Sequence, residues 1–387
     1  MAITGLALAA LTIATCVASA QTAGQRGDPP RAYVITTFSY VGELVWNVGG
    51  GARGGATFLG VADVQITLPL GSLVGWAGAR VLVLAIGTHG GAPSTFVGDV
   101  QGVSNIEAPP AVRLEEAWLQ QNLFGNRLSG LVGRFDVNAE FYRLQSGALF
   151  LNSSFGIGPE FSQSGGAGKR PSLFPNTAFG ARLAFKPARN LVWRAAAVDG
   201  PMLIGEVAVL VRSDTAEQPR ERRFAIGRGR TRPYGAKVAL GAWYYPARFS
   251  DLSDSTRHRG SGGAYLIGDI TMRSLTAFAQ LGVGDGRVNQ ISGYVAGGLT
   301  LTAPIRSRTQ DVVGVAVAAA LNGSHFERAQ TLIGVLAAGE TTAELTYLAQ
   351  FGPWLSVQPD AQYVIHPGGT RGLRNATVLG LRVAVSH

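Results

Sequence analysis

The stretch Leu355-Ser356-Val357-Gln358-Pro359-Asp360-Ala361-Gln362-Tyr363 alternates one apolar side chain with one polar side chain from end to end. Successive side chains of a β-strand point to opposite faces of the sheet, so a strand with this pattern has one apolar face and one wet face. A soluble β-sandwich strand shows the same pattern, but a sandwich buries its apolar face and does not need many such segments in series. The stretch therefore predicts a strand that separates an apolar medium from water.

The same alternation recurs along the chain, between clusters of Gly, Pro, Asn and Asp that are typical of turns. Helical periodicity is nearly absent. An even number of strands near sixteen is typical of a transmembrane antiparallel β-barrel, so we predict an all-β fold of this kind. The predicted strands are approximately 32–45, 55–68, 78–88, 111–122, 128–138, 178–187, 191–199, 203–212, 234–246, 263–273, 275–284, 290–302, 311–321, 341–351, 355–365 and 375–386.

The composition agrees with a barrel. The chain is 46% hydrophobic and only 15% charged, yet after the N-terminus no run reaches the roughly 20 continuous apolar residues that a membrane helix needs. Apolar residues that are abundant but interrupted are expected where lipid-facing and channel-facing side chains alternate.

The N-terminus has the features of an export signal. Residues 2–17 are small or apolar and uncharged, and Ala18-Ser19-Ala20 fits the small-x-small cleavage rule. We predict a signal peptide at 1–20, a short periplasmic segment at 21–31 and one outer-membrane barrel at 32–387. Lipidation at Cys16 is an alternative, although Thr15 is an unusual residue before a lipid-bearing cysteine. Cleavage after Ala20 would leave no thiol, and therefore no disulfide or thiolate metal site.

Connection lengths predict the sides of the barrel. Long connections at 89–110, 139–177 and 247–262 suit outer loops, whereas 187–190 and 352–354 suit short periplasmic turns. The connection 213–233 breaks the rule, because its position is periplasmic but it is long and rich in arginine. An RNA-binding tract is the other interpretation of this composition, and export disfavours it.

Several segments of the chain form a set whose order and spacing are specific. They are YVGEL (40–44), WNVGGG (46–51), GDVQGVSNIEAP (98–109), RLEEAW (113–118), GRFDVN (133–138), EF (140–141), LFLNSSFGIGP (149–159), LGAWY (240–244), ELTY (344–347), PWLSVQPD (353–360) and YVIHPGG (363–369). In this order and at this spacing, the segments resemble the carbohydrate-selective (OprB-type) porin family. The resemblance implies a sixteen-stranded outer-membrane barrel that takes up sugars by passive diffusion. The chain departs from the family pattern in the arginine-rich 213–233 segment and in ending with Val385-Ser386-His387 rather than an aromatic residue.

The connection 139–177 is the predicted constriction loop. It is too long for an idle loop in a compact structure, and six apolar side chains could pack it against the inner wall of the barrel. The alternative is a loop that covers the channel mouth from outside. The six side chains are Phe141, Leu149, Phe150, Phe155, Phe161 and Phe174.

Alternation also predicts which polar side chains face the channel, because a charge facing lipid near the midplane costs about 2–4 kcal/mol. Guanidinium and carboxylate groups can bind the hydroxyls of a sugar. The alternative is that several of these groups only pair with one another to hold the loop. Glu116 does not fit, since simple alternation places it toward lipid unless it lies at an interface or beside a bulge. The predicted pore-lining residues are Arg113, Glu115, Arg134, Asp136, Asn138, Glu140, Arg182 and Arg194.

The expected partners follow from charge and location. The net charge is +9, but the arginines are dispersed, so lipopolysaccharide, membrane lipid and a basic channel are favoured over nucleic acid. We expect sugars as permeants, no catalytic residues, no cofactor and no metal, because the five histidines lack ligand spacing. A general or anion-preferring porin is the main alternative, and an outer-membrane enzyme or adhesin is a weaker one. Trimer and monomer both remain open.

Overall fold

The computed structural model describes residues 34–386, apart from residues 167–169, 212–233, 255 and 331–335. The predicted signal peptide at 1–20, the segment 21–31, the arginine-rich connection 213–233 and His387 lie outside the described residues. Those four sequence predictions therefore remain predictions.

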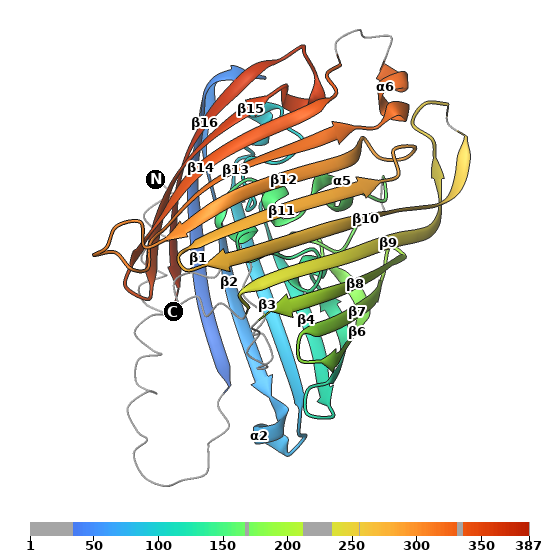
Figure 1. The fold of residues 1–387 in the computed structure, drawn as a ribbon, viewed down its shortest axis with the longest axis vertical. Helices are drawn as coiled ribbons and strands as arrows, with labels where there is room; N and C mark the ends of the chain where they lie inside the picture. The colour runs from blue at the N-terminus through green and yellow to red at the C-terminus, as the bar shows by residue number, and fades with distance from the viewer. Residues whose placement is uncertain (1–33, 167–169, 212–233, 255, 331–335, 387) are drawn as a thin grey trace.

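The described residues form one closed barrel in which β1 pairs with β16 and every pair of neighbouring strands is antiparallel (Figure 1). Sixteen strands had been expected from the alternation, and the part of the chain that the structure describes contains sixteen. The prediction of an all-β antiparallel barrel is confirmed. The strands are β1 (Ile35–Gly51), β2 (Gly55–Pro69), β3 (Ala79–Gly90), β4 (Ala111–Leu123), β5 (Leu128–Phe135), β6 (Ala178–Ala188), β7 (Leu191–Val198), β8 (Met202–Val211), β9 (Ala236–Ser250), β10 (Arg257–Met272), β11 (Leu275–Gly284), β12 (Ile291–Thr302), β13 (Val312–Asn322), β14 (Gly339–Phe351), β15 (Leu355–Ile365) and β16 (Arg374–Ser386).

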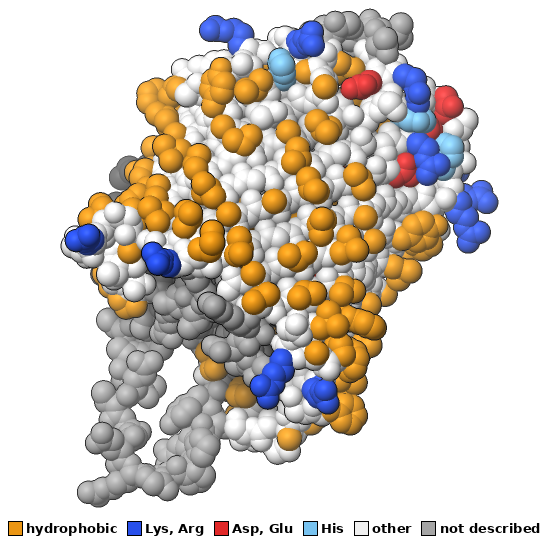
Figure 2. Space-filling model, viewed as in Figure 1, with side chains coloured by type: hydrophobic (Ala, Val, Ile, Leu, Met, Phe, Trp, Pro, Cys, Tyr) orange, Lys and Arg blue, Asp and Glu red, His pale blue; other side chains and the backbone are white. Residues whose placement is uncertain are grey.

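The strands present an apolar outer face, and many of the side chains on the inner face are polar. On β14, the side chains of Thr342, Glu344 and Thr346 are buried on the inner face. The side chain of Leu345, which lies between Glu344 and Thr346 in the sequence, is 56% exposed on the outer face. Figure 2 shows hydrophobic side chains spread over the middle of the wall, with charged side chains gathered toward its two ends. This distribution matches a wall that faces hydrocarbon between two aqueous compartments.

The two ends of the barrel differ. One end, which we name the turn end, carries the short connections 124–127 and 352–354 and the helix α2 (Leu70–Val74). The opposite end, which we name the loop end, carries longer connections and the helix α6 (Ser324–Gln330) (Figure 1). Among the described residues, no helix is long and apolar enough to cross a membrane.

One predicted loop is wrong. Residues 247–262 were expected to be an outer loop, but β9 continues to Ser250, β10 starts at Arg257, and the connection is only 251–256. In the extended hairpin, His258 pairs with Phe249, and a register shift follows near Gly260. The outer face of this part of the hairpin is polar, with Arg248, Arg257 and Arg259 exposed, so no row of apolar outward residues marks it as strand.

The described residues of the connection 136–177 fold back into the barrel instead of standing outside it. The connection carries the short helices α4 (Ser153–Gly156) and α5 (Pro159–Ser162), which Figure 1 shows enclosed by the strands. Phe161 packs on Trp243 with ring centroids 4.7 Å apart, and Phe150 packs on Phe278 at 5.7 Å. Of the six apolar side chains expected to pack the loop, Phe141, Leu149, Phe150, Phe155 and Phe161 lie buried with inner-wall residues, and Phe174 packs at a separate inner cluster.

Candidate functional site

The enclosed loop 136–177 is held from several sides of the barrel by inner-wall side chains. On β14, the Glu344 carboxylate accepts the backbone N–H groups of Leu151 at 2.6 Å and Asn152 at 3.0 Å. From β11 and β12, Gln280 donates to the carbonyl of Phe155 at 3.1 Å, and the Tyr294 hydroxyl donates to the carbonyl of Ser154 at 2.7 Å. These bonds give the loop's backbone groups partners inside the channel, where a compact loop would otherwise leave them unsatisfied.

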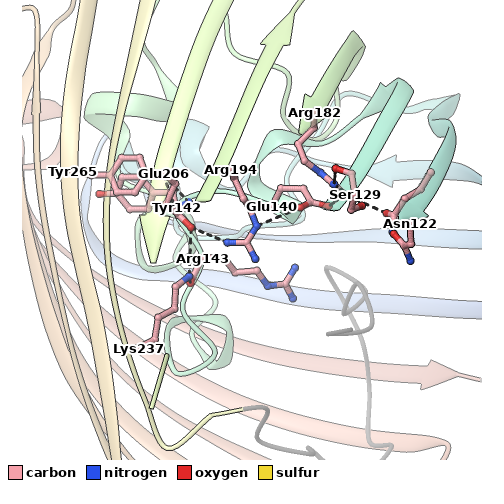
Figure 3. Close-up of polar contacts among 11 residues, drawn as sticks. Asn122, Ser129, Glu140, Tyr142, Arg143, Arg182, Arg194, Glu206, Lys237 and Tyr265 are labelled. Carbon is pink, nitrogen blue, oxygen red and sulfur yellow. Dashed lines mark hydrogen bonds and ion pairs between the residues drawn. The ribbon is translucent and has the colours of Figure 1, made fainter. Parts of the chain in front are cut away.

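On the opposite wall, five charged side chains form a chain of ion pairs, which we name the charge row. Arg182 lies 3.1 Å from Glu140, Glu140 lies 3.6 Å from Arg194, Arg194 lies 3.1 Å from Glu206, and Glu206 lies 3.9 Å from Lys237. Four of these residues come from the consecutive strands β6 to β9, and Glu140 comes from the loop. Figure 3 shows the charge row following the wall past the start of the loop.

Glu206 joins the charge row to the loop. Its Oε2 accepts a hydrogen bond from the Tyr142 backbone N–H at 3.0 Å and another from the Tyr265 hydroxyl at 2.8 Å. Lys237 donates to the carbonyl of Arg143 at 2.6 Å. The charge row thus fixes the place where the loop leaves the wall, as Figure 3 shows.

The charge row is unevenly exposed. The side chains of Glu206, Arg182 and Lys237 are 0%, 3% and 7% exposed, whereas Arg194 retains 16% and Glu140 retains 10%. Arg182 also donates to the Ser129 carbonyl and hydroxyl and to Gln120. Arg194 and Glu140 are therefore the members with the most surface left for a solute.

A second carboxyl of the loop, that of Glu160 on α5, is buried against β11, on the wall that faces the charge row. Its Oε1 accepts a hydrogen bond from the Tyr142 hydroxyl at 2.9 Å. Gly282 on β11 leaves the space it needs, since a Cβ at that position would lie 1.9 Å from Oε1. Burial raises the pKa of Glu160 to about 7, although the hydrogen bond from Tyr142 works in the other direction.

The position of Glu116 is explained by a bulge. The register between β3 and β4 shifts where Leu84 pairs with Glu116 and Ala85 pairs with Leu114, so Glu115 is the extra residue. A bulge inserts one residue and reverses the facing of those that follow. Glu116 is thereby turned inward, where it accepts from the Trp118 indole at 2.8 Å and from the Asp136 backbone N–H at 3.2 Å.

Arg134 lies on the outer face, and its predicted inward position is wrong. It pairs with Phe179, which is 62% exposed, while its neighbour Phe135 is fully buried in the inner cluster. Directly paired residues of an antiparallel sheet point to the same side. Arg134 is at the loop end of β5, where its Nε donates to the Thr177 hydroxyl at 2.8 Å, so its charge stands near the rim and not at the midplane.

Asp136 and Asn138 were expected on the same strand face as Arg134, but β5 ends at Phe135. The Asp136 carboxylate accepts from the Asn138 backbone N–H at 2.8 Å, which caps the short helix η2 (Val137–Ala139) and terminates the strand. The Asn138 amide then donates to carbonyls of Phe141, Tyr142 and Gly156. Both residues shape the start of the loop.

The other predicted residues divide into two groups. Arg113 is on the inner face near the loop end, where it donates to the Thr88 hydroxyl at 3.0 Å and the Pro109 carbonyl at 3.1 Å. Glu115 is the buried bulge residue, and its carbonyl accepts from the Thr177 hydroxyl. Glu140, Arg182 and Arg194 are the three predicted residues that the fold brings together in the charge row.

The sequence analysis missed Glu206 and Lys237. Both could have been found with the same rule: in β8, Glu206 alternates with the exposed Leu203, Val207 and Val209, and in β9, Lys237 precedes the exposed Val238. Within the described ranges, no group of three or more His, Cys, Asp or Glu side chains is arranged to hold a metal ion.

Comparison with known proteins agrees with this architecture. The profile of the carbohydrate-selective porin, OprB family, matches residues 53–386. Porin B of Pseudomonas aeruginosa is 27% identical over 180 residues, which span 37% of this chain and 39% of that protein. The chain thus spans about two fifths of the length of this curated relative.

Solved structures show the same fold. The high pH structure of Pseudomonas putida OprB superposes with a TM-score of 0.79 at 20% identity, covering 92% of this chain and 94% of that one. An anion-selective porin from Comamonas acidovorans superposes with a TM-score of 0.56 at 10% identity, covering 92% and 100%. With the family profile extending over nearly all of the barrel, the chain belongs to the carbohydrate-selective porin (OprB) family of non-enzymatic outer-membrane β-barrels.

Proposed function

We propose that this porin admits sugars by passive diffusion and that the passage is narrowest at the loop 136–177, beside the exposed part of the charge row. The observation that carries the proposal is the charge row itself, which places guanidinium and carboxylate groups side by side where the loop joins the wall. Diffusion through a channel needs no bond chemistry, so width and lining groups set the selectivity.

The exposed part of the charge row suits a sugar. A hydroxyl group both donates and accepts hydrogen bonds, and neighbouring Arg194 and Glu140 offer a donor and an acceptor 3.6 Å apart. Contacts with such partly exposed groups are weak enough for a permeant to leave again, which conduction requires. Arg194 and Glu140 are therefore the proposed contact residues, with Arg182, Glu206 and Lys237 holding them in place.

Single-channel conductance of the refolded protein in a planar bilayer, titrated with glucose and maltose, tests the proposal. We expect sugar to reduce the open-channel current. Replacing Arg194 with Gln weakens that block about tenfold, because a hydrogen bond to a charged group contributes about 1.5–3 kcal/mol. Arg306→Gln, an exposed arginine in the turn-end connection 303–311, serves as the control and leaves the block unchanged. Open channels indifferent to both sugars would contradict the proposal.

A general, anion-preferring porin is the second candidate. The observation in its favour is that the charge row contains three cations, Arg182, Arg194 and Lys237, and two carboxylates, Glu140 and Glu206. In the same experiment, strong chloride selectivity without sugar block would favour this candidate.

We also propose that the loop end faces the exterior and the turn end faces the periplasm. β1 begins and β16 finishes at the turn end, and outer-membrane barrels have short periplasmic turns and longer outer loops. The loop end would then contact lipopolysaccharide, and the apolar wall would contact the lipid chains.

We further propose that copies of the chain associate through the outer face of β5 to β9. β5 and β7 have only eight residues each, which span about 19 Å when tilted, less than the apolar band of about 25 Å. A groove of about 830 Å³ crosses this face, lined by small side chains such as Ala181, Ala195 and Ala242. Small side chains allow close packing of proteins in membranes.

The oligomeric state in mild detergent tests this association. We expect trimers by light scattering on the intact protein, and we expect Ala195→Trp, which fills the groove, to yield monomers that still conduct. A monomeric wild-type protein would contradict the proposed interface without affecting the sugar proposal.

A further inference from the structure

A polar groove lies on the outside of the barrel at the loop end, between the end of β15 and the start of β16. It has a volume of about 530 Å³, and its lining includes Tyr363, His366, Arg371, Arg374 and Asn375. It is separate from the charge row, which lies on the inner surface of β6 to β9.

The groove is basic. Arg371 and Arg374 are both exposed, and within the described part of the chain neither forms an ion pair with an acidic side chain. The acidic side chains at this end include Asp251 and Asp285, which lie around β9 to β11 on another part of the rim. Figure 2 shows Lys and Arg side chains at the top of the molecule and the acidic side chains toward the upper right of the view.

The groove is preformed by its own hydrogen bonds. The Asn375 amide donates to the Tyr363 hydroxyl at 3.2 Å, and its Oδ1 accepts from the His366 backbone N–H at 3.1 Å. These contacts bridge the end of β15 and the start of β16 beside Arg374. A ligand therefore meets a site that needs little ordering when it binds.

The wall directly below the groove is apolar. Tyr363 is 45% exposed, and the paired residues Trp46 and Leu379 are 52% and 42% exposed on the same outer face. Tyrosine and tryptophan favour the level of lipid headgroups. Basic groups at the rim and apolar groups beneath them complement a molecule with an anionic head and hydrocarbon chains.

We propose that this groove binds a phosphate group of an outer-leaflet glycolipid, with Arg371 and Arg374 on the phosphate and the wall below against the acyl chains. The inference rests on the proposal that the loop end faces the exterior. Arginine suits phosphate because its planar fork of N–H donors binds two oxygens at once. The apolar wall distinguishes a phospho-glycolipid from free phosphate, which would gain nothing from Trp46 or Leu379.

Lipid binding to the full-length refolded protein in neutral detergent tests the proposal, with diphosphorylated lipid A as the probe and native mass spectrometry as the readout. The double variant Arg371→Gln, Arg374→Gln binds the lipid about 25-fold more weakly, since each basic residue near an anionic membrane surface contributes about fivefold. The matched control is Arg257→Gln, Arg259→Gln, which removes two exposed arginines from the same end of the barrel at β10. The control retains wild-type binding.

Two further arms separate the sources of phosphate. Lipid A with both phosphates removed binds the wild type and the double variant equally, and inorganic phosphate at millimolar concentration displaces little of the intact lipid. Equal binding of intact lipid by the wild type and the double variant overturns the proposal. The proposal is also overturned if the control variant loses as much lipid binding as the double variant. Displacement by inorganic phosphate overturns the assignment to a lipid. Sugar block of the channel is unchanged in the double variant, so failure here is distinguishable from failure of the sugar proposal.

Discussion

Arg134 and Arg182 stand on neighbouring strands but point to opposite sides of the barrel wall. Arg134 pairs with the exposed Phe179, whereas Arg182 pairs with the buried Leu131. The buried guanidinium of Arg182 donates hydrogen bonds to Ser129, Gln120 and Glu140. Removing it leaves these acceptors without a donor, which costs about 1–3 kcal/mol of stability per buried group.

We therefore predict that Arg182→Gln changes single-channel conductance and lowers the urea midpoint of unfolding. Arg134→Gln, the matched control on the outer face, leaves conductance and ion selectivity unchanged. A change in ion selectivity with Arg134→Gln would mean that this side chain reaches the channel after all.

Glu160 supplies a pH-dependent prediction. Burial raises its pKa from 4.5 to about 7, so the folded protein keeps a proton that the unfolded chain releases. The contribution to stability is fully present below about pH 4.5 and is lost as pH rises to about 7, a total of about 3 kcal/mol. Glu160→Gln removes this loss, so the variant and the wild type differ more in stability at pH 8 than at pH 4.

Denaturant unfolding followed by tryptophan fluorescence at both pH values measures the difference. Tyr142→Phe serves as a second variant, because it removes the hydroxyl that donates to Glu160. Without that hydrogen bond the pKa of Glu160 rises further, so the loss of stability extends to higher pH. An equal pH dependence in the wild type and Glu160→Gln would show that this carboxyl does not titrate in the window.

At the scale of elements, alternation predicted the strands because lipid enforces it along every strand that crosses the bilayer. It failed where that constraint ends. Residues 257–262 belong to β10 beyond the apolar wall, and β5 stops at Phe135 because Asp136 caps the helix that follows. The adjacent pair Glu115 and Glu116 was the one sign of the bulge in β4, since two neighbouring carboxylates cannot both face inward on a regular strand.

The anchoring of the loop gives a prediction at the same scale. Glu344 and Glu340 are both inner-face carboxylates on β14, but Glu344 binds the backbone of the loop 136–177 and Glu340 binds the backbone of residues 100 and 101. Glu344→Gln keeps one oxygen that can accept a backbone N–H of the loop. Its amide N–H group faces the other backbone N–H, so that hydrogen bond is lost at a cost of about 1–3 kcal/mol of stability.

We expect Glu344→Gln to loosen the loop 136–177, seen as a larger and noisier single-channel current. The matched variant Glu340→Gln loosens the other connection and leaves the mean current closer to that of the wild type. Identical currents in the wild type and Glu344→Gln would show that this anchor does not hold the loop.

At the scale of the whole molecule, the barrel was predictable and the interior was not. Glu344 and Leu151 are 193 positions apart, and no local pattern predicts that such a pair meets inside a barrel. The charge row was found in part, because Arg182 and Arg194 lie on strands whose facing follows from alternation. The partner Glu206 obeys the same rule, and its role became visible only when the loop placed Glu140 and Tyr142 beside it.

Charge selectivity is the prediction for the whole channel. Three cations against two carboxylates leave the charge row with an excess of one positive charge. One charge acting across about 8 Å of water is worth about 0.5 kcal/mol, or about twofold in permeability. Reversal potentials in a KCl gradient should therefore show a weak preference for chloride, which Glu140→Gln increases. A preference for potassium would contradict this assignment of the channel lining.

The order of signs in the charge row has a further consequence. Positive and negative groups alternate along it, so that, apart from the excess of one positive charge, their potentials largely cancel beyond roughly one ion-pair spacing. A hydroxylated molecule at contact distance gains from both signs, whereas an ion attracted by one group is repelled by the next. Dissolved salt screens electrostatic interactions that act over long distances, but it has little effect on discrimination that depends on contact. The porin would thus sort its solutes in brackish water much as it does in dilute media.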